Sequence, residues 1–311
     1  MRGNRSISWI RTLLMIGNVF GLISGLFLFI VFAFLMSSYV IADTGNEFGN
    51  LEPYVPLMFS LVSFFTITNI FFCSYIINFL RKADDITLLN NRYVIALFSI
   101  SIGGLFTPFV LAQMPNIQVQ STISPKFTIS KGYGGNSLVS GFAALVVYFG
   151  FSLFGTTNVN ENSSIFTSGT PDIIAVSILS TILLWGVINT LTFATPGAQV
   201  SWDNKGTAYK FMNFLAVINL IVATMTLILQ LIAAVLSIIS ILSDMFDRRR
   251  GFLGALFNSM LAAYRIAIQL FIIYTINKII KGLWQKGDKI YYQDYSRLAE
   301  KQREYDMNSN R

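Results

Sequence analysis

Three polar side chains interrupt the apolar segment Gly251–Ile280 near the carboxyl end of the chain. They are Asn258, Arg265 and Gln269, seven and four residues apart, so a helix places them near one face. A guanidinium group in such a place can hold a phosphate or a carboxylate by two parallel hydrogen bonds. The spacing therefore predicts contact with an anionic ligand or a lipid headgroup, and Arg265 is the fixed charge that would make it.

A second group of polar residues consists of uncharged amides inside other apolar segments. Amide side chains in lipid usually hydrogen-bond across helix interfaces, and each such bond is worth about 0.6 to 2 kcal/mol. Taken together, the same amides could line a polar pathway that needs no buried ion pair. These residues are Asn18, Asn69, Asn189, Asn219 and Gln230.

The residues that usually carry catalysis and proton coupling are missing or lie outside the apolar segments. The chain has no histidine, which removes the commonest general base and metal ligand. Every Asp and Glu lies in a loop, at a helix end or in the tail, whereas proton-coupled carriers normally need an acid or a histidine within the membrane. No nucleotide-binding P-loop, zinc-protease helix or serine-hydrolase elbow occurs. We expect a protein that is not an enzyme, with no cofactor and no metal.

For two further features, an interpretation without a functional role is preferred to a metal-binding or reactive one. Asp84 and Asp85 in the basic loop Arg81–Arg92 could hold a divalent cation against a phosphate. Adjacent acids on a short loop are more often solvated charges. Cys73 is the single cysteine, so no internal disulfide is possible, and within its apolar run it is interpreted as a small buried residue.

Composition assigns the chain to the membrane proteins. Of its 311 residues 54% are hydrophobic and 12% are charged, and soluble domains carry about twice that charged share. The 28 Phe and 13 Tyr suit lipid contact and headgroup belts. The net charge of +7 is gathered at a few places, which predicts contact with membrane lipid and not with nucleic acid. The richness in Asn, Ile, Phe and Lys is typical of AT-rich bacterial genomes and suggests a bacterial source.

Seven apolar segments are long enough to cross a membrane, since a hydrocarbon core of about 30 Å takes about 20 helical residues. The predicted fold is an all-α integral membrane protein: a polytopic bundle of six or seven transmembrane helices over residues 1–280, then a short charged helical tail over 281–311. Thr, Ser and Val alternate in the connection 116–137, which suggests a short hairpin there. The segments are Thr12–Ala42, Val55–Leu80, Tyr93–Gln113, Ser137–Gly155, Ile173–Leu191, Phe211–Ser243 and Gly251–Ile280.

The positions of Lys and Arg orient these segments, because cytoplasmic loops carry the excess of basic residues. The amino-terminal stretch and the loop Arg81–Arg92 each contain three, whereas Asp43–Glu52 contains none. We therefore expect the amino terminus in the cytoplasm of a cell whose plasma membrane holds the protein. The apolar run Thr12–Ala42 is about twice as long as a signal-peptide core, so it is interpreted as a retained anchor.

If all seven segments cross the membrane in alternating directions, the position of the last segment conflicts with the charge rule. If Gly251–Ile280 crosses, the tail with its eight basic residues from Lys278 onward lies outside, against the charge rule. If that segment stays at the cytoplasmic face, six crossings remain and the tail is cytoplasmic. Hydropathy favours a crossing. Arg265 weighs against it, since a mid-membrane arginine costs about 2.5–3.5 kcal/mol on insertion scales. The second arrangement is preferred and the first stays open.

Two functions of different classes fit these observations. Many crossings, small loops and the lack of coupling groups predict a transport component, either a facilitating carrier or a membrane subunit of a larger complex. The alternative is a structural or assembly protein that binds partner helices, for which the small residues of Gly17–Gly25 supply a packing surface. In the tail Tyr291, Tyr295, Leu298 and Tyr305 fall near one face of a helix, which suggests docking on the membrane or on a cytoplasmic protein partner.

Overall fold

The computed structural model describes residues 7–42, 55–83, 85–99, 125–154, 170–193, 206–246 and 252–284. The secondary structure of these residues is helical, and six of the helices are long and apolar enough to cross a membrane. The predicted fold class is therefore confirmed. The described residues form two compact units, one up to Ala216 and one from Val217. The helices are α1 (Ile7–Ala42), α3 (Val55–Lys82), α4 (Asp85–Asn90), α5 (Arg92–Phe98), α7 (Pro125–Phe154), α8 (Thr170–Phe193), α9 (Thr207–Phe246) and α10 (Phe252–Leu283).

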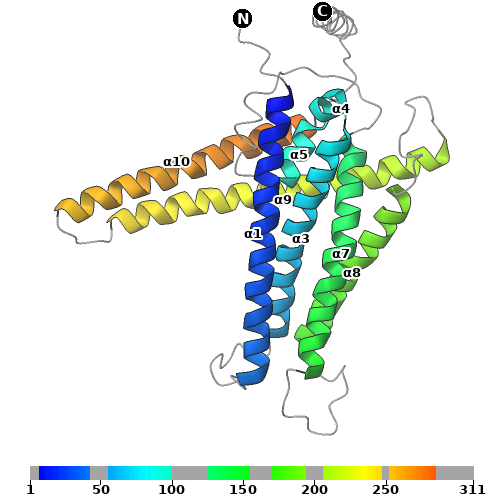
Figure 1. The fold of residues 1–311 in the computed structure, drawn as a ribbon, viewed down its shortest axis with the longest axis horizontal. Coiled ribbons are helices and arrows are strands. Elements are labelled where there is room, and N and C mark those ends of the chain that lie inside the picture. Colours follow the sequence, from blue (N-terminus) through cyan, green and yellow to red (C-terminus); the bar gives the residue numbers. More distant parts are fainter. Residues whose placement is uncertain are drawn as a thin grey trace, which may run out of the picture. The chain divides into compact units, whose positions relative to one another are not determined.

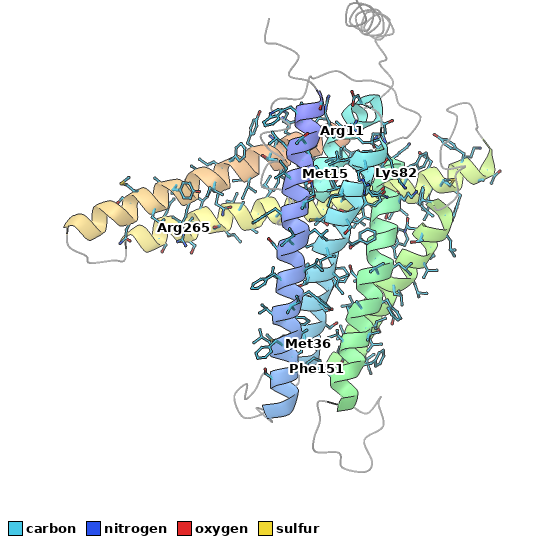
Figure 2. The ribbon with its side chains drawn as sticks, viewed as in Figure 1. Arg11, Met15, Met36, Lys82, Phe151 and Arg265 are labelled. Carbon is cyan, nitrogen blue, oxygen red and sulfur yellow. The ribbon has the colours of Figure 1, made fainter. Side chains whose placement is uncertain are left out.

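The first unit is built from four long helices, and each of them packs on the next long helix along the chain. α1 contacts α3, α3 contacts α7, and α7 contacts α8, with successive helices antiparallel (Figure 1). Arg11 and Lys82 lie at one end of these helices, and Met36 and Phe151 lie at the opposite end (Figure 2). We call these the Arg11 end and the Phe151 end.

The starts of these helices and their composition follow from elementary backbone chemistry. Proline lies in the first turn of α3, α7 and α8, at Pro56, Pro125 and Pro171. Its missing N–H would have had no helical partner there. In lipid every backbone polar group must be bonded within the segment, so these runs of Ile, Val and Phe are helical despite their strand propensity. Apolar side chains such as Phe27 and Phe34 of α1 are exposed, as contact with lipid requires.

Glycine spacing brings α1 and α3 close together. Gly17, Gly21 and Gly25 repeat every four residues and are all buried. A Cβ atom on Gly25 would lie 2.6 Å from the side-chain nitrogen of Asn69 on α3. The packing surface predicted at Gly17–Gly25 is therefore used within the chain, between α1 and α3.

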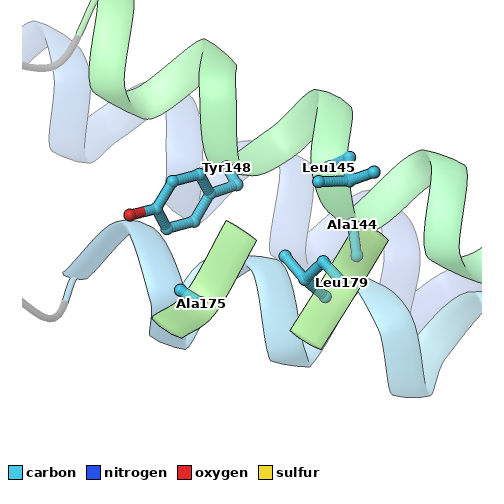
Figure 3. Packing of buried hydrophobic residues seen from close by; sticks show 5 residues of the cluster. All are labelled: Ala144, Leu145, Tyr148, Ala175 and Leu179. Carbon is cyan, nitrogen blue, oxygen red and sulfur yellow. The ribbon is translucent and has the colours of Figure 1, made fainter. Parts of the chain in front are cut away.

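The contact between α7 and α8 is closer still. A Cβ atom on Gly186 of α8 would lie 2.3 Å from the backbone nitrogen of Leu138 on α7. Such an approach is open only to glycine. Towards the Phe151 end the same two helices share an apolar cluster (Figure 3), which consists of Ala144, Leu145, Tyr148, Ala175 and Leu179.

The predicted third crossing, Tyr93–Gln113, is wrong as a single crossing. α3 ends and α7 begins at the same end of the unit, because the hydroxyl of Tyr75 donates to the carbonyl of Thr128 at 3.4 Å. At the other end Phe59 stacks on Phe151, with ring centroids 4.7 Å apart. A single crossing between α3 and α7 would have placed the start of α7 at the Phe151 end. The described part of this segment is α5, which is buried in protein instead of exposed to lipid; the rest lies outside the described residues.

The predicted hairpin in the connection 116–137 is also wrong where the structure describes it. The chain is helical from Pro125, so α7 begins well before the predicted Ser137. The hydroxyl of Ser130 donates to the carbonyl of Lys126 at 2.9 Å, one turn back on the same helix. Serine and threonine satisfied in this way are compatible with a transmembrane helix, so the hydroxyl residues from Pro125 onward did not indicate a strand.

α9 begins in the first unit and continues into the second. Phe127, Phe193, Leu215 and Ala216 form an apolar cluster at the Arg11 end, and the ammonium group of Lys126 donates to the side-chain oxygen of Asn213. In the second unit, the indole N–H of Trp284 joins α10 to α9 through a hydrogen bond to the hydroxyl of Thr224, at 2.8 Å. α9 and α10 match the predicted segments Phe211–Ser243 and Gly251–Ile280 to within a few residues.

Candidate functional site

The short helix α5 lies inside the Arg11 end of the first unit and stops there. Six of its seven residues are buried, including Arg92 with 5% of its surface exposed. At its far end Phe98 stacks on Phe72 of α3, with centroids 4.6 Å apart, and meets Tyr133 of α7 edge-on at 5.8 Å. Phe72 precedes the last residue of α3 by ten residues, or about 15 Å of helix. α5 therefore ends beside the apolar part of α3, well inside the first unit.

The packing of the Phe98 ring between α3 and α7 depends on a glycine. Tyr75 of α3 meets the Phe98 ring edge-on at 5.6 Å. On the α7 side, a Cβ atom on Gly132 would lie 2.4 Å from the tip of that ring. Because Gly132 has no side chain, α5 can lie against both α3 and α7.

The inner end of α5 is followed by a polar residue, Ser99, in apolar surroundings. The N–H of Ser99 donates to the carbonyl of Ile95 at 2.9 Å, which closes the last turn. Ser99 is fully buried, and its hydroxyl has no hydrogen-bond partner among the residues that the structure describes. The last carbonyls of a helix have no partner within it, and they carry the negative end of the helix dipole. The Ser99 hydroxyl thus belongs to the residue that directly follows the carbonyl end of α5.

Arg11 connects the end of α3 to the start of α4 at the Arg11 end of the unit. Its guanidinium donates to the backbone carbonyls of Leu80 and Ala83 at 2.5 and 2.7 Å, and to the carboxylate of Asp85 at 2.7 Å. It thereby caps the end of α3 and holds the start of α4. The Asp85 side chain is ion-paired with Arg11 and 51% exposed, so it is a solvated charge that also has a protein partner. Asp84 lies outside the described residues, which contain no group of three or more metal-ligating side chains.

Hydroxyl and amide groups connect α3 to α7 beyond the tip of α5. The hydroxyl of Thr68 donates to that of Ser140 at 3.2 Å, and Ser140 donates to the side-chain oxygen of Asn136 at 3.0 Å. Nearer the Phe151 end, Ser60 donates to the carbonyl of Ala144 at 2.9 Å. These groups are polar but uncharged, which suits contact with neutral solutes, weakly held ions or each other.

Two of the predicted amides lie on the facing helices α1 and α3. Asn69 donates to the carbonyl of Gly21 at 3.1 Å, a bond between helices of the kind predicted. Asn18 instead donates to Leu14 on its own helix at 2.8 Å, and its side-chain oxygen is buried without a partner. Cys73 is fully buried, and its thiol points to the side-chain oxygen of Asn69 at 3.9 Å, in agreement with its interpretation as a small buried residue.

The other three predicted amides lie on α8 and α9. Asn189 on α8 donates to Trp185 on its own helix at 2.9 Å and packs against Gly134 of α7. Asn219 and Gln230 belong to the second unit, where Asn219 is buried and Gln230 is half-buried with its side-chain oxygen unpartnered. The five amides are therefore divided between the two units, three in the first and two in the second.

The predicted stripe on α10 is present, with its charge exposed. Arg265 is exposed between the half-buried Asn258 and Gln269, and its neighbours Met260 and Tyr264 are exposed as well. No hydrogen bond or ion pair joins Arg265 to another residue in the part of the chain that the structure describes. A charge in such surroundings requires a partner from lipid, water or another protein.

The sequence-based predictions missed α5 and Ser99, although a signal was present. Gly103, Gly104 and Pro108 interrupt the apolar segment Tyr93–Gln113, and interrupted apolar segments are the best pointer to discontinuous helices in membrane proteins. The predicted tail contacts, Tyr291, Tyr295, Leu298 and Tyr305, lie outside the described residues.

Two places thus combine polar chemistry with membrane surroundings. The inner end of α5 offers uncharged oxygens, and Arg265 offers a single cation. Their interpretation rests on this chemistry, because the chain matches no protein-family model, no curated protein and no solved structure.

Proposed function

We propose that the chain is a transport component of the cell membrane, either a facilitating carrier or the membrane subunit of a larger complex. It would have no catalytic or proton-coupling groups of its own. The observation that carries this proposal is α5, which ends inside the first unit. Helix ends are tolerated at membrane depth only where protein or a water-filled cavity surrounds them, and discontinuous helices form the binding sites of many transporters. A purely structural bundle has no need of such an element.

The distribution of charge supports a cytoplasmic Arg11 end. If each of the six long helices crosses once, the amino terminus and the tail lie on the same side. Only Arg248, Arg249 and Arg250 then lie outside, with Arg265 in the membrane. The conflict at the last helix disappears, so α10 can cross with the tail in the cytoplasm. The basic residues of the first unit's described helices are Arg11, Arg81, Lys82, Arg92, Lys126, Lys131 and Lys210.

Transport is tested with the purified full chain in liposomes, by osmotic swelling with glycerol, urea or potassium chloride outside. Gly132→Leu would drive a side chain into the Phe98 ring and displace α5, so we expect it to lower the flux. Gly150→Leu is the matched control on the same helix, because a Cβ atom there meets nothing within 4 Å. Both variants are compared at equal amounts of monodisperse protein.

Two further outcomes decide between the forms of the proposal. Flux by the isolated chain supports a carrier, whereas co-purification of a nucleotide-binding partner from cells supports a membrane subunit. If no probe moves and no such partner co-purifies, the transport role is wrong and an assembly role takes its place.

Arg265 has a separate proposed role as a contact for lipid phosphate. Arg265 follows Phe252, the first residue of α10, by thirteen residues, or about 20 Å along a helix that is longer than the hydrocarbon core is thick. Helical side chains lean towards the amino end of their helix, and a long arginine can extend further to the headgroups. Asn258 and Gln269 would supply additional hydrogen bonds on the same face.

A further inference from the structure

The inner end of α5 has the features of a cation site. Ser99 is fully buried with an unpartnered hydroxyl. It directly follows a helix whose last residue, Phe98, is enclosed by Phe72, Tyr75 and Tyr133. A buried hydroxyl without a partner carries a desolvation cost that nothing offsets. A bound ligand that accepts its lone pairs would remove that cost.

The electrostatics of this place favour a positive ligand. The carbonyl end of α5 carries the negative pole of the helix dipole, and Ser99 directly follows the last residue of that helix. Arg92 is seven residues away at the opposite end of α5, or about 10 Å. Of the two lysines near the start of α7, Lys131 is exposed and the ammonium of Lys126 is bonded to Asn213.

In the described part of this neighbourhood no carboxylate is free, which limits the charge of the ligand. Asp85, which belongs to the adjacent α4, is paired with Arg11. Divalent cations in proteins are usually held by carboxylates, whereas carbonyl and hydroxyl oxygens alone suffice for alkali cations. A monovalent ion is therefore the ligand that this chemistry fits.

We infer that the inner end of α5, with the hydroxyl of Ser99 and the carbonyls of the last turn, binds a partly dehydrated alkali cation, Na⁺ or K⁺. The site rests on the proposed transport function and extends it. The bound cation would be either the transported solute itself or an ion that is transported together with the solute. Binding itself requires no transport and is measured without it.

The test uses thermal unfolding of the purified full chain in detergent at constant ionic strength, with choline chloride replaced stepwise by sodium or potassium chloride. We expect a saturable rise in Tm with one alkali cation. Ser99→Ala should weaken the apparent affinity roughly tenfold or more, because even indirect supports of a metal site contribute that much. Ser99→Thr keeps the hydroxyl and should retain binding.

The matched control is Ser130→Ala, which removes another buried hydroxyl, one that is already bonded to Lys126 on its own helix. It should lower stability without changing the cation dependence. If Ser99→Ala does not fold, equilibrium binding of radioactive sodium and rubidium to the wild type and to Ser99→Thr decides the question.

Three results would overturn the inference: no saturable effect of either cation, the same effect with choline, or full binding by Ser99→Ala, which would leave water as the occupant. These results are distinct from failure of the transport function. Flux of a neutral probe without cation binding would reject the site alone. Cation binding without flux or a transport partner would reject the transport function alone.

Discussion

At the scale of the single residue, two substitutions of Arg265 separate the effect of its charge from that of its guanidinium geometry. Arg265→Lys keeps the charge and loses the planar fork, whereas Arg265→Gln loses both. We expect Arg265→Gln to lower affinity for phosphatidylglycerol about fivefold, because one basic residue near an anionic surface is worth about 1 kcal/mol. Arg265→Lys should be intermediate. Native mass spectrometry of the purified protein with added lipid measures this.

The control for this prediction is Arg81→Gln, which removes an exposed charge from the first unit. It corrects for the general loss of one positive charge. If both Arg265 variants retain phosphatidylglycerol as the wild type does, Arg265 has no specific lipid partner and its exposed position on α10 has another explanation.

At the scale of the element, the α7–α8 contact depends on one missing methyl group. Gly186→Ala would place Cβ within 2.3 Å of the backbone nitrogen of Leu138, which no side-chain rotation can relieve. Separation of the helices should cost about 1–3 kcal/mol, as overpacking does elsewhere. We expect a lower Tm of the purified protein, measured in detergent.

Gly150→Ala serves as the control for this contact, since its Cβ would meet nothing within 4 Å. Alanine is the better helix former by about 1 kcal/mol, so this variant should be neutral or slightly more stable. Equal Tm values for the two variants would show that α7 and α8 do not approach each other as closely as Gly186 and Leu138 indicate.

At the scale of the whole molecule, the order of crossings can be read by labelling from outside the cell. In a Cys73→Ser background, single cysteines at Asn46 and Asn160 should react with an impermeant thiol reagent in intact cells. Cysteines at Asn90 and Asn116 should react only after permeabilisation. This pattern follows from α3 and α7 meeting at the Arg11 end, together with the distribution of charge.

The positions at 116 and 160 distinguish the two threadings. A single crossing at Tyr93–Gln113 would expose residue 116 and protect residue 160, the reverse of the expected pattern. A tag after Arg311 should be protected as well, because six crossings return the chain to its starting side. Cleavage of that tag by protease added outside would instead show that the number of crossings is odd.

The sequence by itself determined the membrane class and the approximate position of all six long helices. The free energy of moving about 20 apolar residues into lipid is a local property, and a helix is the conformation that satisfies their backbone. The glycine spacing at Gly17–Gly25 likewise indicated close packing. The stripe of Asn258, Arg265 and Gln269 followed from helical periodicity alone.

Only the tertiary structure decided which apolar segment crosses and which is enclosed. Tyr93–Gln113 is apolar enough for either outcome, because a protein interior and a lipid tail have the same effect on a hydropathy scale. The contacts of Phe98 with α3 and α7 show that α5 is buried by protein. Ser99 likewise resembles any other serine in the sequence, since its burial and its missing partner arise from packing between segments far apart in the chain.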